Sequence, residues 1–359
     1  QDSNVFHKYD ASAPEGERWT DLTDNIPMLG GAQGDFNAQS SYNMLVAVHP
    51  ENENVVFIGG TNLYRSTNGY SDDSETEWVG GYTRNNNSAS YFNHHPDQHS
   101  VAFFPNSPNE MLSSHDGGIS ITSDNLKNTL TDITDQEGNV VEEVMIIWNP
   151  LNNAYVTSQF YTVAIDEENV GDPSLLGGMQ DNSTYILQSD NRDDDWIDIG
   201  AGDGSYCYYD LTSAVVSAQF ANIFRYALID GQFEFFNIST PNAGDDQLNL
   251  FVNPIMFDPV APNKVFVGGR GLIYYTLNIR QNPQDDDWLS FGSGALPANQ
   301  RVSAMGASVE PQGVLYIGTE AGRLYKVENS TSLTGITNVS SGLPSGYISS
   351  IMVDPTNAD

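Results

Sequence analysis

The chain repeats one pattern of apolar and polar positions along most of its length. In each repeat a short apolar segment is followed by a turn of Pro, Asn or Asp, by a second apolar segment and often by two glycines, as in "LVAVHPENENVVFIGG" from Leu45. The residues just before these turns, from His49 to Asp354, recur about every 51 residues. Because apolar residues alternate within the segments and helical periodicity is almost absent, the pattern predicts β-strands. Seven repeats begin at Leu45, Ser100, Thr162, Tyr206, Pro254, Gly306 and Ser350.

A repeat of about 50 residues built from short strands is typical of a β-propeller, in which each blade is a four-stranded sheet. We therefore predict an all-β fold in which residues 1–359 form a propeller with about seven repeats. The first strand of each blade should line the central channel, and the third and fourth strands should form an outer hairpin. Complete blades are predicted near residues 45–78, 100–148, 162–196, 206–236, 254–288 and 305–328, and partial blades at 4–22 and 350–359.

The two partial blades leave two alternatives for the ends of the chain. Residues 4–22 look like the outer half of a blade, and residues 350–359 look like an inner strand and its turn. Either the ends pair to close the ring, or the sequence is part of a larger propeller or a longer protein with further domains. We favour the second, because no second strand follows the last inner strand.

The outer hairpins carry a recurring turn motif. In "SDNRDDDW" the spacing of Ser189, Asn191, Asp193 and Trp196 matches the Asp-box pattern S-x-D-x-G-x-T-W, and "SAPEGERW", which ends at Trp19, matches it in part. Asp and Asn side chains can bond back to their own turn. These motifs are therefore predicted to be structural, with the Trp covering the edge of the blade.

The segment "HHPDQH" suggests metal or catalytic chemistry. If it continues the strand that follows it, His95, Asp97 and His99 lie on one face, which is the ligand type of a zinc site with two imidazoles and one carboxylate. Three ligands from one segment form only half of a site, and Pro96 interrupts the strand. We therefore expect these side chains to orient their neighbours rather than to hold zinc alone, with His115 as the nearest additional donor.

Three further polar turns contain Asp beside Gly: "SHDGGIS" with Asp116, "GGMQDNST" with Asp181, and "GAGDGSY" with Asp203. Such pairs are good turn formers, so each alone is weak evidence for a site. Their occurrence at equivalent positions of successive blades predicts that the three carboxylates cluster at the mouth of the channel. Clustered carboxylates repel one another, which raises a pKa or recruits a cation such as calcium or zinc.

The order of these motifs resembles that of bacterial BNR/Asp-box propellers with sortilin-like repeats, a glycosyl-hydrolase-like family. The resemblance covers about residues 94–210 and rests on "HPDQH", "HDGGI", "SQFYTVAID", "GGMQDNST" and "GAGDGSYCYYD". Ser183 and Ser205 stand where the family usually has Gly. The resemblance implies that the polar residues around the channel mouth are His99, Asp116, Gln159, Asp181 and Asp203; His115, Gln180 and Asn182 are the further binding candidates beside them.

The composition of the chain excludes several classes of binding partner. Thirteen Lys and Arg against 47 Asp and Glu give a net charge of −34, which repels nucleic acid and anionic lipid and suits solubility in salty water. No apolar run approaches the length of a membrane span, so membrane insertion is not expected. One cysteine, Cys207, excludes an intrachain disulfide. With the family resemblance, these features predict a bacterial protein that is secreted or on the cell surface, its signal peptide already removed.

Two functions from different classes fit these observations. The first is a binding module that recognises a protein, a peptide or a glycan through the channel mouth. The alternative is a glycoside hydrolase with paired carboxylates among Asp116, Asp181 and Asp203, which would need to lie about 5–5.5 Å apart for retention or about 6.5–9.5 Å apart for inversion. A sialidase is not expected, because the nine arginines show no triad motif. The sequence alone leaves open whether the protein is an enzyme, and neither function requires an organic cofactor.

Overall fold

The computed structural model describes residues 4–30, 33–83, 91–134, 140–153, 158–166, 169, 171–191, 193–200, 202–210, 213–229, 232–330, 332–354 and 357. Within these ranges the fold is all-β, as predicted: six four-stranded antiparallel sheets and two two-stranded hairpins, with 3-10 turns as the only helices. The 3-10 turns are η1 (Thr23–Asn25), η2 (Gln39–Ser41), η3 (Gln219–Ala221), η4 (Ile279–Gln281) and η5 (Asp285–Asp287). The chain divides into two compact units, Gln1–Thr157 and Ser158–Asp359, which are described separately.

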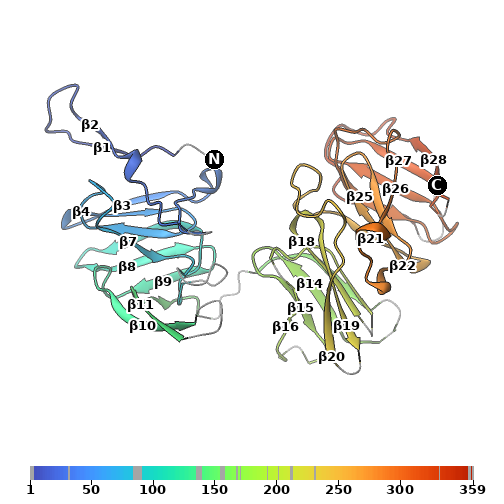
Figure 1. Cartoon of the computed structure of the whole chain (residues 1–359), viewed down its shortest axis with the longest axis horizontal. Coiled ribbons are helices and arrows are strands. Elements are labelled where there is room, and N and C mark those ends of the chain that lie inside the picture. Colours follow the sequence, from blue (N-terminus) through green and yellow to red (C-terminus); the bar gives the residue numbers. More distant parts are fainter. Residues whose placement is uncertain are drawn as a thin grey trace. The chain divides into compact units, whose positions relative to one another are not determined.

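Unit 1 holds two of the four-stranded sheets, drawn in blue to green in Figure 1. The first sheet consists of β3 (Leu45–His49), β4 (Asn52–Gly59), β5 (Leu63–Ser66) and β6 (Thr76–Gly80), in that order. The second has the order β12–β9–β8–β7, from β7 (Gln98–Phe104), β8 (Ser107–His115), β9 (Gly118–Thr122) and β12 (Asn149–Pro150). A separate hairpin of β10 (Thr129–Thr134) and β11 (Val140–Met145) is inserted before β12. The N-terminal hairpin pairs β1 (His7–Tyr9) with β2 (Trp19–Asp21).

Unit 2 holds four sheets, each with its strands in sequence order (Figure 1). The first sheet consists of β13 (Phe160–Ile165), β14 (Leu175–Met179), β15 (Thr184–Leu187) and β16 (Ile197–Asp198). The second consists of β17 (Cys207–Asp210), β18 (Ser213–Ala218), β19 (Asn222–Ile229) and β20 (Gln232–Asn237). The third consists of β21 (Ile255–Asp258), β22 (Ala261–Gly268), β23 (Ile273–Thr276) and β24 (Leu289–Phe291). The fourth consists of β25 (Val302–Ala307), β26 (Leu315–Thr319), β27 (Leu324–Asn329) and β28 (Thr334–Asn338). The last sheet thus extends ten residues beyond the predicted blade at 305–328.

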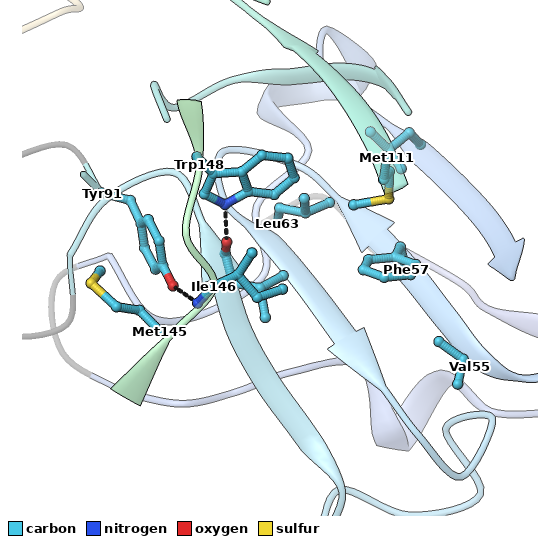
Figure 2. Packing of buried hydrophobic residues seen from close by; sticks show 10 residues of the cluster. Val55, Phe57, Leu63, Tyr91, Met111, Met145, Ile146 and Trp148 are labelled. Atoms are coloured by element: carbon cyan, nitrogen blue, oxygen red, sulfur yellow. Dashed lines mark hydrogen bonds between the residues drawn. The ribbon is translucent and has the colours of Figure 1, made fainter. Parts of the chain in front are cut away.

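The larger apolar cluster of unit 1 lies between its two sheets (Figure 2). Phe57 and Leu63 from the first sheet and Met111 from the second are fully buried there. The segment before β12 closes this core: Trp148 is fully buried, and its indole N–H donates to the carbonyl oxygen of Val79 at 2.9 Å. A four-stranded sheet is therefore packed face to face on the next one, as in successive propeller blades.

Unit 2 is built in the same way, with one apolar cluster between each pair of successive sheets. Leu176 and Val216 belong to the cluster between its first and second sheets, Val215 and Val267 to the next, and Phe266 with Leu315 and Ile317 to the third. Fully burying an aliphatic side chain contributes about 1.5–3 kcal/mol. Packing between sheets, rather than within one sheet, therefore holds the unit together.

Glycines at the end of the second strand permit this close packing. A Cβ on Gly59, at the end of β4, would lie 2.8 Å from the Gln98 side chain at the start of the next sheet. A Cβ on Gly178, at the end of β14, would lie 2.3 Å from the carbonyl oxygen of Ser205, just before β17. The glycine pairs of the sequence repeat therefore mark the places where the next sheet begins.

The C-terminal segment differs from its prediction. The partial blade at 350–359 was expected to begin with an inner strand, but no strand is present among its described residues, and residues 355, 356, 358 and 359 lie outside them. Ile348 and Ile351 instead pack on the last sheet, where they would contact a Cβ added at Gly318 or Gly306. A strand needs a hydrogen-bonded neighbour, and an isolated bridge from Asp354 to Asn357 does not supply one.

Candidate functional site

The predicted site residues lie either just after the second strand of a sheet or just before its first strand. Asp116 and Asp181 follow second strands, β8 and β14, whereas His95–His99 and Asp203 precede or begin first strands. Since first and second strands are antiparallel, the start of one and the end of the other meet at the same end of the sheet. We call this end of each sheet the turn end.

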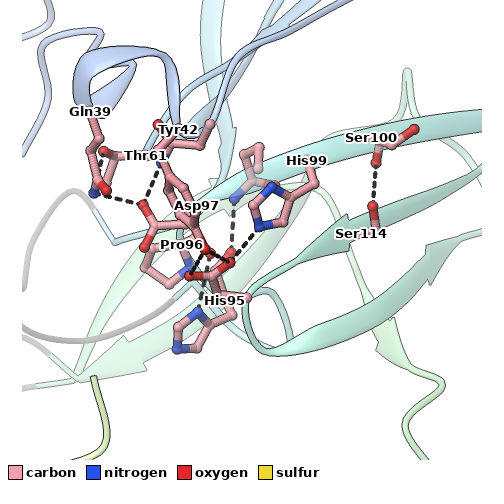
Figure 3. Close-up of polar contacts among 12 residues, drawn as sticks. Gln39, Tyr42, Thr61, His95, Pro96, Asp97, His99, Ser100 and Ser114 are labelled. Carbon is pink, nitrogen blue, oxygen red and sulfur yellow. Dashed lines mark hydrogen bonds and ion pairs between the residues drawn. The ribbon is translucent and has the colours of Figure 1, made fainter. Parts of the chain in front are cut away.

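In unit 1, a bend at Asp97 decides which way the "HHPDQH" side chains point. Strand β7 begins only at Gln98, and Asp97 has a φ of 65°, so the alternation expected for residues 95, 97 and 99 does not hold. The Asp97 carboxylate is buried and accepts a hydrogen bond from the side-chain amide of Gln39 at 2.8 Å (Figure 3). It accepts a second one from the side-chain amide of Asn43 at 2.6 Å. Burial first, and then the charge of Asp116, raise the pKa of Asp97 to about 6.

His99 instead contacts Asp116. Its Nε2 contacts Oδ1 of Asp116 in an ion pair or charge-assisted hydrogen bond. The Tyr42 hydroxyl donates to the same carboxylate, at 3.2 Å from both oxygens. The Tyr42 ring also lies edge-to-face with the His99 ring, with centroids 5.3 Å apart. We name Tyr42, His99 and Asp116 the Tyr-His-Asp group; Tyr42 and His99 are exposed and Asp116 is half-buried.

His115, a predicted binding residue, lies in the interior of unit 1. Its Nε2 is 3.0 Å from the Ser120 hydroxyl, which itself donates to the carbonyl oxygen of Asn93. The hydroxyl proton is thus engaged, so Nε2 of His115 carries the hydrogen. Burial, then His95, lower the pKa of His115 to about 4, and complete burial lowers that of His94 far below its usual value. Both imidazoles are therefore neutral near pH 7.

The described residues contain no group of three His, Cys, Asp or Glu side chains arranged to hold a metal ion. The three predicted ligands instead contact different partners. The His95 side chain lies against Gly117 and stacks near His115. The Asp97 carboxylate is bound by side-chain amides, and His99 is bound to Asp116. A zinc site needs at least three ligands that converge. The metal ligands His95, Asp97 and His99 stay a prediction, as does a bound cation.

In unit 2, Asp181 and Asp203 lie in adjoining turns. The carboxylate of Asp203 accepts a hydrogen bond from the backbone N–H of Asp181 at 2.9 Å, and the N–H of Asp203 donates to the side chain of Gln219 at 3.0 Å. Asp181 has a φ of 56° and Ser183 one of 68°. Both residues thus adopt the backbone conformation that favours Gly.

The remaining predicted residues surround these two turns. The Tyr161 hydroxyl donates to the side-chain oxygen of Gln180, and the Asn182 amide donates to the backbone oxygen of the same residue at 2.9 Å. Burial first, then Asp203 and Asp181, raise the pKa of Tyr161, which places its phenol near both carboxylates. Gln159 is exposed immediately before β13.

The predicted cluster of three carboxylates spans the two units. Within unit 2, Asp181 and Asp203 lie together, and within unit 1, His99 and Asp116 do. Asp116 and the other two carboxylates belong to different units, so their grouping at one channel mouth stays a prediction.

No sequence motif singles out Tyr42, Gln39 or Asn43. They come from the connection before β3, which lies outside the repeated pattern. The position of this connection could have indicated these residues. The connection precedes a first strand, just as "HHPDQH" precedes β7, and therefore reaches the turn end of the first sheet.

No protein-family model matches the chain, and no curated protein sequence matches it. Among solved structures, the chain is similar to the extracellular domain of a putative hybrid two-component system from B. thetaiotaomicron, with 18% identity and a TM-score of 0.40. The similarity covers 89% of this chain and 37% of that one, so the chain spans well under half of that structure's length. Membership of the BNR/Asp-box family stays a prediction. Within the described ranges, no helix is long and apolar enough to cross a membrane.

Proposed function

We propose that the chain is a binding module that recognises a glycan through the turn ends of its sheets. The observation that carries this proposal is the Tyr-His-Asp group, which joins an aromatic ring, an imidazole and a carboxylate at one accessible place. A sugar offers hydroxyl groups to a carboxylate or imidazole and an apolar face to an aromatic ring. A few such polar groups beside an aromatic surface are what fix the orientation of a small ligand.

The turn end in unit 2 has related chemistry. Tyr161, Gln180 and Asp203 provide a phenol, an amide and a carboxylate within two neighbouring turns. Protein partners are usually anchored by buried aromatic and Arg side chains at the centre of an interface. Both turn ends are instead polar and acidic, which favours a hydroxyl-rich ligand over a protein or peptide. A secreted or cell-surface location would suit this function.

A glycan array followed by titration calorimetry tests the proposal. Plant and algal polysaccharide fragments would identify a ligand, and the Asp116→Asn and Tyr42→Phe variants should weaken its binding about tenfold each, because each removes one polar contact. Asp73→Asn is the matched control, since Asp73 is an exposed carboxylate in the turn after β5. If the array gives no binding, or if Asp116→Asn and Asp203→Asn bind like the control, the proposal is wrong.

The alternative function, a glycoside hydrolase, has one observation in its favour. Asp97, whose pKa is raised to about 6, is influenced by Asp116 and hydrogen-bonds to it through the backbone. A carboxyl with a raised pKa near a second carboxyl is the kind of pair that such enzymes use as acid and base. Asp97 is buried under Gln39 and Asn43, however, away from any substrate. Release of reducing sugar from the array ligands, lost in Asp116→Asn, would establish the hydrolase instead.

A further inference from the structure

Unit 2 contains a cavity of about 460 Å³ between its first two sheets. Ile186, Ile197 and Ile199 line it from the side of β15 and β16, and Tyr209 and Tyr226 line it from β17 and β19. Its volume is within the range of about 300–1,000 Å³ that is usual for small-molecule pockets. None of the residues proposed above to bind a glycan lines this cavity.

Two features of the sequence leave this space open. Strand β16 has only two residues, whereas β19 in the next sheet has eight. The outer edge of the first sheet therefore leaves part of the second uncovered. In addition, Ala214 of β18 contributes only a methyl group to the cavity, where its neighbours Val215 and Val216 are larger.

The cavity has one charged group, the carboxylate of Asp198 at its exposed edge. Its Oδ1 accepts hydrogen bonds from the Ser183 hydroxyl at 2.6 Å and from the N–H of Gly200 at 3.1 Å, which hold the side chain in place. Burial first, and then Asp198, raise the pKa of Tyr226, so the carboxylate lies near this phenol. An isoleucine at the same edge, Ile197, is 54% exposed, so a ligand can reach the carboxylate from solvent.

We propose that this cavity binds a small organic ammonium ion with an aromatic or branched aliphatic body. The body would lie between the isoleucines and the two tyrosine rings, and the ammonium group would contact Asp198. Tyrosine faces attract a cation within about 6 Å of the ring centre, which adds to the attraction of the carboxylate. The net charge of −34 also raises the local concentration of cations. A neutral or anionic ligand of the same shape would lose both contributions.

Titration of the full chain with phenethylamine tests the proposal, with 2-phenylethanol and 3-phenylpropionate as neutral and anionic probes of similar shape. Saturation-transfer NMR should detect the amine with an affinity at least about fivefold higher than that of the alcohol, the size expected for one partly exposed ion pair. No saturable binding of the amine, or equal binding of the alcohol, would overturn the proposal.

Three variants test whether the probe binds in the cavity. Asp198→Asn keeps an acceptor oxygen for Ser183 and Gly200 and should bring amine binding down to that of the alcohol. The control Asp195→Asn removes an equal charge from the exposed turn outside the cavity and should change nothing. Ala214→Leu should fill the cavity and abolish binding of all probes.

Because Ala214→Leu can disturb the core, Ile197→Ser at the exposed edge provides a second test and should weaken the amine and the alcohol alike. Circular dichroism would establish that each variant is folded. Amine binding that survives in folded Ala214→Leu and Ile197→Ser would place the ligand elsewhere and refute the proposal.

Discussion

Asp97 shows how a single backbone conformation decides the role of a side chain. In the sequence, His95, Asp97 and His99 alternate and suggest one ligand-bearing face. The φ of 65° at Asp97 turns its carboxylate into the interior, towards two amides, and leaves His99 to pair with Asp116. The residue types at the turn ends could be predicted because Asp-Gly turns have a clear signature. The direction of each side chain could not, since it depends on where β7 begins.

The raised pKa of Asp97 makes the stability of unit 1 depend on pH. Its carboxyl has a pKa of about 6 when folded and about 3.9 when unfolded. Between these values the folded state binds more protons, so the free energy of unfolding falls as the pH rises from about 4 to 6 and stays low above 6. The Asp97→Asn variant lacks the ionisable group and therefore avoids this fall in the free energy of unfolding. Its side-chain oxygen can still accept hydrogen bonds from Gln39 and Asn43. At pH 8 the variant should be about 1–2 kcal/mol more stable than the wild type.

The comparison of the two proteins at two pH values isolates this residue, because all other groups titrate in both. The difference in the free energy of unfolding, measured by urea denaturation, should nearly vanish at pH 4. A variant less stable than the wild type at pH 8 would show that the ionised carboxylate is stabilising there.

The same geometry predicts the metal content. The side chains of His95, Asp97 and His99 contact different partners, so we expect protein purified without chelators or a His tag to contain well under one equivalent of zinc. Elemental analysis by mass spectrometry measures this directly. One equivalent of zinc that disappears in the His95→Ala, His99→Ala double variant would contradict the expectation.

At the scale of elements, buried cations connect successive sheets. Arg65 on β5 is 2% exposed, and its guanidinium donates to the backbone oxygen of Asn125 at 2.5 Å and to the side chain of Asn128 at 3.0 Å, both just beyond the second sheet's β9. It also pairs with Glu77 on the neighbouring strand β6. In unit 2, Lys264 similarly donates to the backbone oxygen of Ser330 in the next sheet.

Arg65→Met should loosen the contact between the two sheets of unit 1. The variant keeps most of the apolar stem but leaves the backbone oxygen of Asn125 without its charged donor, which costs about 2–3 kcal/mol. Lys127→Met is the control, since Lys127 is exposed in the same connection. Urea unfolding followed by tryptophan fluorescence should show a lower midpoint for Arg65→Met only. Equal midpoints for the two variants would mean that the sheets are held by apolar packing alone.

The strands were predictable from the sequence, but several of their partners were not. Alternating apolar segments and turn residues indicate where a strand can form, because this information is local. Among the described residues of the predicted blade at 100–148, β10 and β11 pair only with each other, and β12 takes the place beside β9. The Asp-box identity of the outer turns stays a prediction; in one of these turns the Ser189 hydroxyl accepts from the N–H of Asn191 at 3.1 Å. Trp19 is nevertheless 66% exposed, because β1 and β2 pair with no further strand.

At the scale of the whole molecule, the charge of −34 is the dominant feature. Most of the apolar clusters lie between sheets, and many of the carboxylates are exposed in turns. Repulsion among so many like charges opposes the compact state, and salt screens it over a Debye length that shortens from about 30 Å at 0.01 M to about 10 Å at 0.1 M.

Added salt should therefore stabilise the protein. We expect the midpoint of thermal unfolding to rise by roughly 3–5 °C between 0.01 M and 0.5 M NaCl at pH 7.5, because the unfolded chain spaces its charges further apart and gains less from screening. Most of the rise should occur below about 0.15 M, where the Debye length changes most. KCl should act like NaCl, and sucrose of equal osmolarity should not reproduce the steep early rise. A midpoint that is constant or falls over this range would show that local ion pairs, such as that of Arg301 with Glu320, outweigh the overall repulsion.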